Sequence, residues 1–211
     1  IAQGGPLSHW RDLRDAQSSG RTLYGDSATV GAGLPLLRTL RALREGGDRI
    51  HALAGILSGS LAWLFDGYDG IQPFSLRVGD AHRAGYTEPD PRDDLSGTDV
   101  QRKLLILARA AGLELEPNDI AVESLLPDAL AACPRSDVEQ VLSALDAPLR
   151  ERHARAREQG TTLRHIGRLD RDGSARVSVE ALPADHPLAL GGGTDNKVAI
   201  WAAKVLERSS P

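Results

Sequence analysis

The chain has 211 residues, a formal net charge of −4 and 41% hydrophobic residues. This is the composition of an ordinary soluble globular protein with one good core, and its charge excludes a general attraction to nucleic acid or to anionic membranes. A single cysteine, Cys133, excludes an intrachain disulfide framework and fits a reducing compartment. No signal-peptide pattern opens the chain, and no apolar run approaches the ~20 residues of a membrane span. We therefore predict a cytoplasmic location.

Residues 1–25 read as the end of a separate unit. Ser8 is a candidate cap for a helix that continues through Ser19 and ends at Gly20, and a short strand is expected at 22–24. A helix followed at once by a strand is the repeating step of a doubly wound sheet.

Residues 28–35 contain two glycines and end at Pro35, which suits the first turn of a helix that continues to Gly46. Two interpretations stay open. The segment is either a tight strand-to-helix turn, or a loop whose carbonyl oxygens hold a monovalent cation or face a cofactor.

The next segments predict a strand over 49–57, a helix from Ser58 to Phe65 and another helix over 73–84. Ser58 is the expected N-cap of its helix, and capping alone is the simpler interpretation of its role. Trp63 and Phe65 are expected in the core rather than as stacking surfaces.

The most heavily charged stretch covers residues 85–103 and has the sequence GYTEPDPRDDLSGTDVQRK. Because Pro89 and Pro91 restrict the backbone, we expect its acidic residues to lie on a rigid, irregular loop without helix. A helix is expected from about Leu95, with Gly112 as its stop signal.

Asp99 and Lys103 are four residues apart and therefore lie on one face of that helix. They form either an ordinary surface ion pair, which is typically weak, or a functional pair in a cleft. A lysine held among several carboxylates is a candidate proton donor or acceptor, and the rigid acidic loop before it favours this second interpretation.

The rest of the chain reads as structural. We expect a strand over 120–125, a long helix over 136–158 with a break near Ala147 because of Pro148, a hairpin over 161–182 with its turn at 172–173, and an edge strand over 197–201. His165 is expected to be a surface or core histidine, since no second ligand lies at metal spacing. Gly191–Gly193 lacks the residues of a phosphate loop, and no GxGxxG occurs in the 211 residues.

The stretch 85–103 resembles the signature of the homoserine dehydrogenases almost throughout, and the sequences TVGAGLP (29–35) and GILSGSL (55–61) resemble further motifs of that family. The resemblance covers about residues 22–201. It implies NAD- or NADP-dependent interconversion of L-homoserine and L-aspartate 4-semialdehyde, a step in threonine and methionine biosynthesis. It also implies an α+β fold with a mixed or antiparallel sheet covered by helices, next to a remnant of a Rossmann-type cofactor domain.

The resemblance implies roles for individual residues. Lys103 would donate or accept the proton at the substrate C4 oxygen, and Asp99 would orient it. Glu88 would hold the α-ammonium group of the substrate. The remaining implied positions are Asp94 and Asp93 beside the substrate, Gly85, Ser58 and Gly59 beside the cofactor, and the carbonyls of Val30, Ala32 and Leu34 around a sodium-like ion.

Two positions depart from the family pattern. The usual opening A-N-K-G reads Ala2-Gln3-Gly4-Gly5, so a catalytic lysine of the family falls on Gly4, and the usual cation-binding glutamate is Ser27, with Asp26 beside it. We therefore expect the metal site to be weaker or rearranged.

The expected organisation is an incomplete dinucleotide-binding end (1–25), a catalytic and dimerisation domain (26–201) and a C-terminal helix or tail (202–211). The resemblance implies a homodimer built on the sheet. The segments VESL (122–125) and DHPL (185–188) look most like the forms fused to an aspartate kinase. The alternatives are a non-enzymatic fragment that serves only as a dimerisation module, and an unrelated α+β binding protein.

Overall fold

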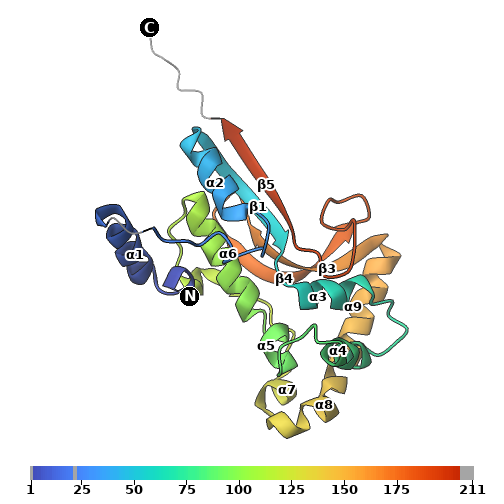
Figure 1. Ribbon diagram of the computed structural model, residues 1–211. Coiled ribbons are helices and arrows are strands. Elements are labelled where there is room, and N and C mark those ends of the chain that lie inside the picture. The colour runs from blue at the N-terminus through green and yellow to red at the C-terminus, as the bar shows by residue number, and fades with distance from the viewer. Residues whose placement is uncertain (1, 21–22, 205–211) are drawn as a thin grey trace.

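A computed structural model describes residues 2–20 and 23–204 (Figure 1). The α-helices are α1 Leu7–Ser19, α2 Leu36–Glu45, α3 Gly59–Asp66, α4 Phe74–Arg83, α5 Pro91–Leu95, α6 Thr98–Ala111, α7 Asp128–Ala132, α8 Val138–Val141 and α9 Asp146–Glu158. The strands are β1 Asp48–Ile56, β2 Ile120–Val122, β3 Thr161–Leu169, β4 Ala175–Pro183 and β5 Lys197–Lys204. Short 3₁₀ turns lie at Ala2–Gly4, Pro117–Asp119, Arg135–Asp137 and Leu142–Leu145. In the described part of the chain, no helix is both long and apolar enough to cross a bilayer.

The five strands form one mixed sheet in the order β2-β4-β3-β1-β5. The pair β2–β4 is parallel and the other pairs are antiparallel. The turn between β3 and β4 is closed by a hydrogen bond from the Gly173 amide to the Asp170 carbonyl, as the Asp-Gly signal predicted. The expected α+β fold with a mixed sheet is therefore confirmed.

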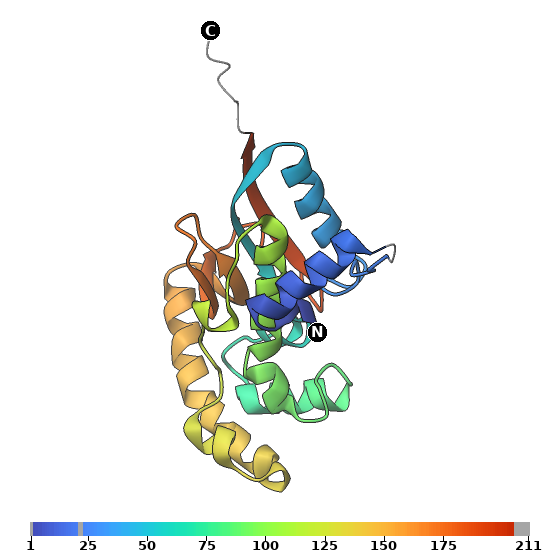
Figure 2. The ribbon, with the colours of Figure 1, turned by 90° about the vertical axis from the view of Figure 1, so that its left-hand side faces the viewer.

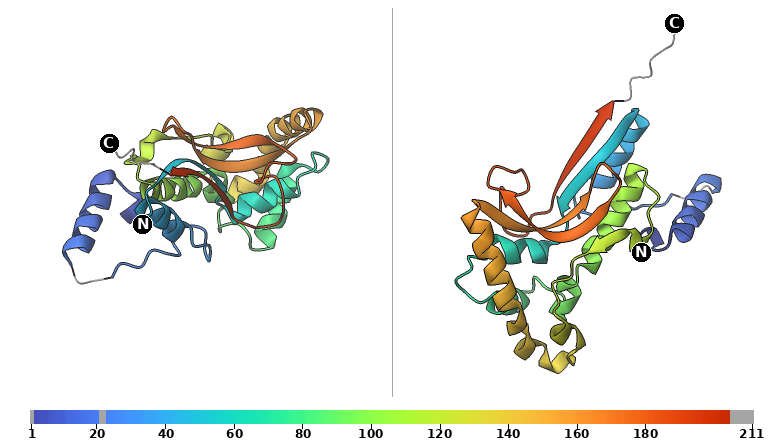
Figure 3. Two further views of the ribbon diagram at one scale, coloured as in Figure 1. Left: turned by 90° about the horizontal axis from the view of Figure 1, so that it is seen from above. Right: turned by 180° about the vertical axis from the view of Figure 1, so that it is seen from behind.

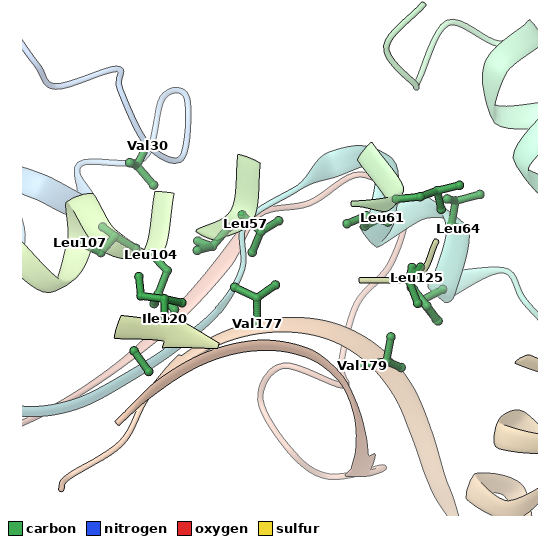
Figure 4. Packing of buried hydrophobic residues seen from close by; sticks show 14 of the residues in the cluster. Val30, Leu57, Leu61, Leu64, Leu104, Leu107, Ile120, Leu125, Val177 and Val179 are labelled. Carbon is green, nitrogen blue, oxygen red and sulfur yellow. The ribbon is translucent and has the colours of Figure 1, made fainter. Parts of the chain in front are cut away.

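The helices that pack on the sheet lie on one of its faces. The right-hand view of Figure 3 shows the sheet from behind, with the strands in front of these helices. Helix α6 crosses this face, and its Leu104 and Leu107 are fully buried. Figure 4 shows these two side chains near Leu57, which directly follows β1, with Val177 of β4 close by. Each buried leucine contributes roughly 1.5–3 kcal/mol, so this cluster determines where α6 lies on the sheet.

The opposite face of the sheet is partly covered by the loop that precedes β5. Leu188 and Ala189 of this loop cluster with Ala54, Ile56 and Ile166, and all five side chains are buried.

Helix α1 stands apart from the sheet at the left of Figure 1, and in Figure 2 it lies in front of α6. It has no buried residue, and polar contacts join it to the chain. The Leu7 amide donates to Glu116 at 2.9 Å, and Arg11 pairs with Glu114 at 2.5 Å.

Several sequence predictions need correction. Pro6 rather than Ser8 precedes α1, and Leu23 and Tyr24 are not in a strand, while Thr22 lies outside the described residues. Strand β2 ends at Val122 rather than at 125. Ala202–Lys204 belong to β5 rather than to a tail, and the remainder of 202–211 is outside the described residues.

The long helix expected over 136–158 is also divided differently. Ser136 lies in a 3₁₀ turn and caps no helix, and the break falls at Leu142–Leu145 rather than near Ala147. Pro148 lies in the first turn of α9, where its missing N–H costs no hydrogen bond.

Candidate active site

Lys103 lies on the first half of α6, at the end of β1. Its ammonium group is 2.7 Å from a carboxylate oxygen of Asp99 and donates a hydrogen bond of 2.9 Å to the Leu57 carbonyl. The Lys103 side chain is 26% exposed and that of Asp99 is 53% exposed. Both groups can therefore be reached from solvent while the amine is held by two oxygen atoms.

The segment after β1 presents two serines to the acidic loop. Ser58 caps α3 by accepting from the Leu61 amide at 3.3 Å, as predicted, and its hydroxyl lies 2.8 Å from that of Ser60. Ser60 donates a hydrogen bond of 2.6 Å to Asp94. The other oxygen of Asp94 accepts from the Glu88 amide at 2.8 Å. Asp94 thus joins the start of α3 to the backbone of the acidic loop.

The acidic loop is not wholly irregular, contrary to the expectation of no helix. Pro91 is the first residue of α5, and Asp90 caps it by accepting from the Arg92 amide at 3.0 Å. A proline is compatible with a helix at this first position, although not further inside one. Helix α5 carries Asp93, which is exposed, and Asp94, which is half-buried.

Arg92 and Arg135 attach this loop to the segment before α8. Arg92 pairs with Asp90 at 2.6 Å and donates to the Cys133 carbonyl at 2.7 Å, and Arg135 donates to the Pro89 carbonyl at 3.1 Å. The hydrogen bond from Arg92 is the main cause that lowers the pKa of the Asp90 carboxyl. Asp90 is therefore a structural acid that holds the loop.

Glu88 and Gly85 lie on the exposed part of the loop. Gly85 has a positive φ of 75°, and a side chain there would meet nothing within 4 Å. Its backbone is thus open to a flat ligand.

The structure brings Lys103 and Glu88 to the same short segment, residues 57–60, from two directions. Lys103 bonds to Leu57, and the Glu88 backbone is tied to Ser60 through Asp94. The sequence had not indicated Ser60 as a contact of Asp94. The sequence did offer a signal for this contact. Ser60 follows the capping Ser58 by two residues, which places both hydroxyls at the first turn of α3.

The turn over 28–35 contains two consecutive residues with positive φ, Gly31 at 79° and Ala32 at 50°. Asp26, the acid beside it, is buried and bonded to Arg41 at 2.8 Å. The Arg41 guanidinium holds the pKa of Asp26 below its usual range. Because this carboxylate is already paired, backbone carbonyls remain the expected ligands for a cation here. In the described residues, no group of three or more His, Cys, Asp or Glu side chains could hold a metal ion.

Gly4 lies against the first half of α6. A Cβ built on Gly4 would be 2.3 Å from Cγ of Arg102, the residue next to Lys103. The departure from the family pattern therefore lies beside the candidate site, and a side chain at position 4 would require Arg102 to move.

His165 is a core residue, which is one of the two locations predicted for it. It is 3% exposed, and neither ring nitrogen has a hydrogen-bond partner among the described residues. Burial lowers its pKa to about 4. Its ring lies below Gly97, the residue that precedes α6, so it supports the site helix without reaching the site.

Comparison with known proteins shows the family to which this chain is similar. The family model described as homoserine dehydrogenase matches residues 35–208. A bifunctional aspartokinase/homoserine dehydrogenase 2 of Escherichia coli is 46% identical over 205 residues, which is 95% of this chain and 25% of the relative. A chloroplastic bifunctional aspartokinase/homoserine dehydrogenase 2 of Zea mays is 44% identical over 209 residues, with 98% of this chain and 23% of the relative covered.

The fold is also found in a solved structure. A homoserine dehydrogenase from Thiobacillus denitrificans superposes with a TM-score of 0.74 at 25% identity, over 93% of this chain and 42% of that one. The chain thus spans about a quarter of the two bifunctional relatives and less than half of this structural neighbour.

Proposed function

Because the chain belongs to the homoserine dehydrogenase family, we propose that it forms the substrate-binding and catalytic part of an enzyme that interconverts L-homoserine and L-aspartate 4-semialdehyde. The single observation that carries this proposal is the Lys103 ammonium group held between the Asp99 carboxylate and the Leu57 carbonyl. An ammonium group has three N–H donors, so two oxygen partners leave one donor for a substrate oxygen.

Lys103 moves the proton in this proposal. When homoserine is oxidised, neutral Lys103 accepts the proton of the C4 hydroxyl as the C4 hydride leaves. In the reverse direction, the ammonium group donates that proton to the aldehyde oxygen. Asp99 stabilises the charged form of the lysine and orients it.

Glu88 binds the α-ammonium group of the substrate. Its carboxylate is exposed, and its backbone is held by Asp94 at 2.8 Å. A charge-assisted hydrogen bond from the ammonium group would fix one end of the substrate, while Lys103 fixes the other. Asp93 and Asp94 add negative potential on the same side.

When bound, oxidised NAD or NADP would accept the hydride from C4 as homoserine is oxidised, and the reduced form would supply it in the reverse direction. The backbone at Gly85, where an added side chain would meet nothing within 4 Å, leaves space for the nicotinamide side of such a cofactor. Ser58 and Gly59 at the start of α3 would lie beside it. We propose that residues 1–25 end a dinucleotide-binding unit and that 26–201 form the catalytic and dimerisation domain. The separate position of α1 and the share of the relatives that this chain covers support that division.

The enzyme is expected to be a homodimer, and fusion to an aspartate kinase fits the bifunctional relatives. The cytoplasmic location stays a prediction, since one of these relatives is chloroplastic. The alternative of a fragment that acts only in dimerisation is not favoured by the match to the homoserine dehydrogenase family.

Substitution of Lys103 tests the mechanism. In an enzyme that contains this chain and a complete cofactor domain, Lys103→Ala should lower kcat by roughly 10²–10⁴-fold, the usual contribution of a general acid–base group. The measurement is the absorbance of reduced cofactor with homoserine as substrate. Glu88→Ala should chiefly raise KM, and Arg38→Ala, which removes an exposed cation of α2, should change neither constant. Full activity in Lys103→Ala would refute the mechanism, and inactivity of the unaltered enzyme would favour the dimerisation fragment.

A further inference from the structure

Trp63, which was expected in the core, is only half-buried and contacts two groups outside its own helix. The Arg77 guanidinium of α4 lies over its indole ring, 4.0 Å from the ring centroid. The ring of Tyr86 lies 5.4 Å from it, at an interplanar angle of 39°. Tyr86 is 46% exposed and is the second residue of the acidic loop. Trp63 therefore joins α4 and α3 to the beginning of that loop.

Arg77 also holds the last turn of α3. Its side chain donates to the carbonyls of Trp63 at 2.6 Å and Leu64 at 2.8 Å. The Trp63 carbonyl also accepts from the Gly67 amide that caps the helix, at 3.4 Å, so Arg77 adds a second donor at this helix end. A side chain at Gly67 would be 1.8 Å from the Arg77 guanidinium, so the chain passes close to it. One arginine thus binds the backbone of α3 and the ring of Trp63 at the same time.

Helix α3 contacts the acidic loop at two points. Near its start, Ser60 reaches the loop through Asp94, which holds the Glu88 amide. In its second half, Trp63 packs on Tyr86. Two residues of chain span at most about 7 Å, so Tyr86 and Glu88 cannot move independently of each other.

We propose that Arg77 and Trp63 are positioning residues that hold Tyr86 against α3 and thereby keep the Glu88 carboxylate at the distance from Lys103 that an amino-acid substrate requires. Neither residue touches the reacting atoms. Their effect passes through the Tyr86 ring, the exposed backbone of the loop and Glu88. This inference rests on the proposed role of Glu88, and its structural part can be tested without any substrate.

Hydrogen exchange tests the structural part. The Tyr86 amide donates to the Ala81 carbonyl at 2.9 Å and the Glu88 amide donates to Asp94, so both amides report on opening of the loop. Trp63→Leu should raise their exchange rates by about two-fold to ten-fold, the range expected for loss of one aromatic pair. Trp63→Phe keeps an aromatic ring there and should restore most of the protection.

Arginine variants of α4 provide a matched pair. Arg77→Gln should raise exchange at Tyr86 and Glu88, whereas Arg83→Gln should not, because Arg83 pairs with Asp80 at the exposed side of the same helix and with no other acid among the described residues. Unchanged exchange in Trp63→Leu would overturn the proposal. An equal rise at the buried amides of α6 would also overturn it, since the contact would then be a general stability contact.

Kinetics tests the functional part. In an active enzyme, Trp63→Leu should raise KM for homoserine by about two-fold to ten-fold with a smaller change in kcat, and Trp63→Phe should recover it. An unchanged KM with the expected exchange pattern would refute the link to Glu88. If the variants show the expected exchange pattern but the unaltered enzyme has no activity, the proposed function is refuted and the anchoring of the loop stands.

Discussion

At the scale of single residues, the two oxygen atoms that contact Lys103 act on it differently. Asp99 lies one helical turn away and supplies negative charge, while the Leu57 carbonyl supplies a fixed position at the end of a buried strand. If Asp99 were its partner alone, Lys103 would form a mobile surface ion pair that contributes little to the free energy of unfolding. The second partner is what converts an ordinary helix pair into a held amine.

The cation site on the turn over 28–35 is tested by ion titration. Because Asp26 is paired with Arg41, a bound sodium ion would rely on the carbonyls of Val30, Ala32 and Leu34. We expect dehydrogenase activity to rise to saturation with sodium chloride and to rise less with potassium chloride. Choline chloride at equal ionic strength is the control, and a flat response to sodium would contradict the site.

His165 predicts a dependence of stability on pH. Its pKa is about 4 in the folded chain, against an ordinary value of 6.5, so the unfolded chain binds more protons between these two values. The contribution of neutral His165 to the free energy of unfolding is fully present above pH 6.5. It is lost as the pH falls toward 4, by roughly 3 kcal/mol in total. Urea unfolding at several pH values measures this loss. His165→Leu should remove most of the slope in this window, and His9→Leu, which alters an exposed histidine of α1, should keep it.

At the scale of elements, the beginning of α6 depends on Gly97. This residue has a φ of 74°, and a Cβ there would be 3.2 Å from a methyl group of Val122. The left-handed conformation admits the sharp change of direction between α5 and α6. It thereby points Asp99 and Lys103 toward the end of β1.

A matched pair of glycine variants separates backbone strain from packing at this position. Gly173 in the hairpin turn also has a positive φ, of 87°, but a Cβ there would meet nothing within 4 Å. Gly173→Ala should cost about 1 kcal/mol of unfolding free energy. Gly97→Ala should cost roughly 2 kcal/mol or more, since it adds the contact with Val122 to the same strain. Equal costs in urea unfolding would show that packing at Gly97 has no role.

Most elements could be predicted because their signals are local. The hairpin turn, the cap at Ser58 and the stop at Gly112 each depend on neighbouring residues, and the structure has all three. The missed features depend on exact position within an element. The sequence around Pro91 predicts a loop without helix, but Pro91 begins α5. Because proline is tolerated in the first turn of a helix, the break near α9 also falls before Pro148.

At the scale of the whole molecule, the sheet face that lacks helices carries a partly exposed region around Trp201 of β5. Trp201 is 37% exposed and lies opposite Ala52 of β1. The hollow beside Trp201 is also lined by the charged residues Arg168, Asp170 and Arg171. Tryptophan and arginine are residue types that are enriched where one chain packs against another.

The oligomeric state tests the prediction that this face forms a dimer interface. Light scattering after gel filtration should give twice the mass of one chain, and Trp201→Arg should shift the protein to the monomer by burying a charge in the interface. Ile71→Arg, at a residue that is 77% exposed elsewhere on the surface, is the control and should stay dimeric. A monomer at all concentrations of the unaltered protein would contradict the interface.

The sequence by itself determined the family, the α+β class and the Asp99–Lys103 pair, because motif spelling and helical spacing are local properties of the chain. The tertiary structure alone decided that Lys103 meets Leu57, 46 residues earlier, and that Ser60 meets Asp94, 34 residues later. Such contacts depend on how α6 and α3 pack against the same sheet, which is set by the summed burial of many side chains. No pattern of neighbouring residues encodes that sum.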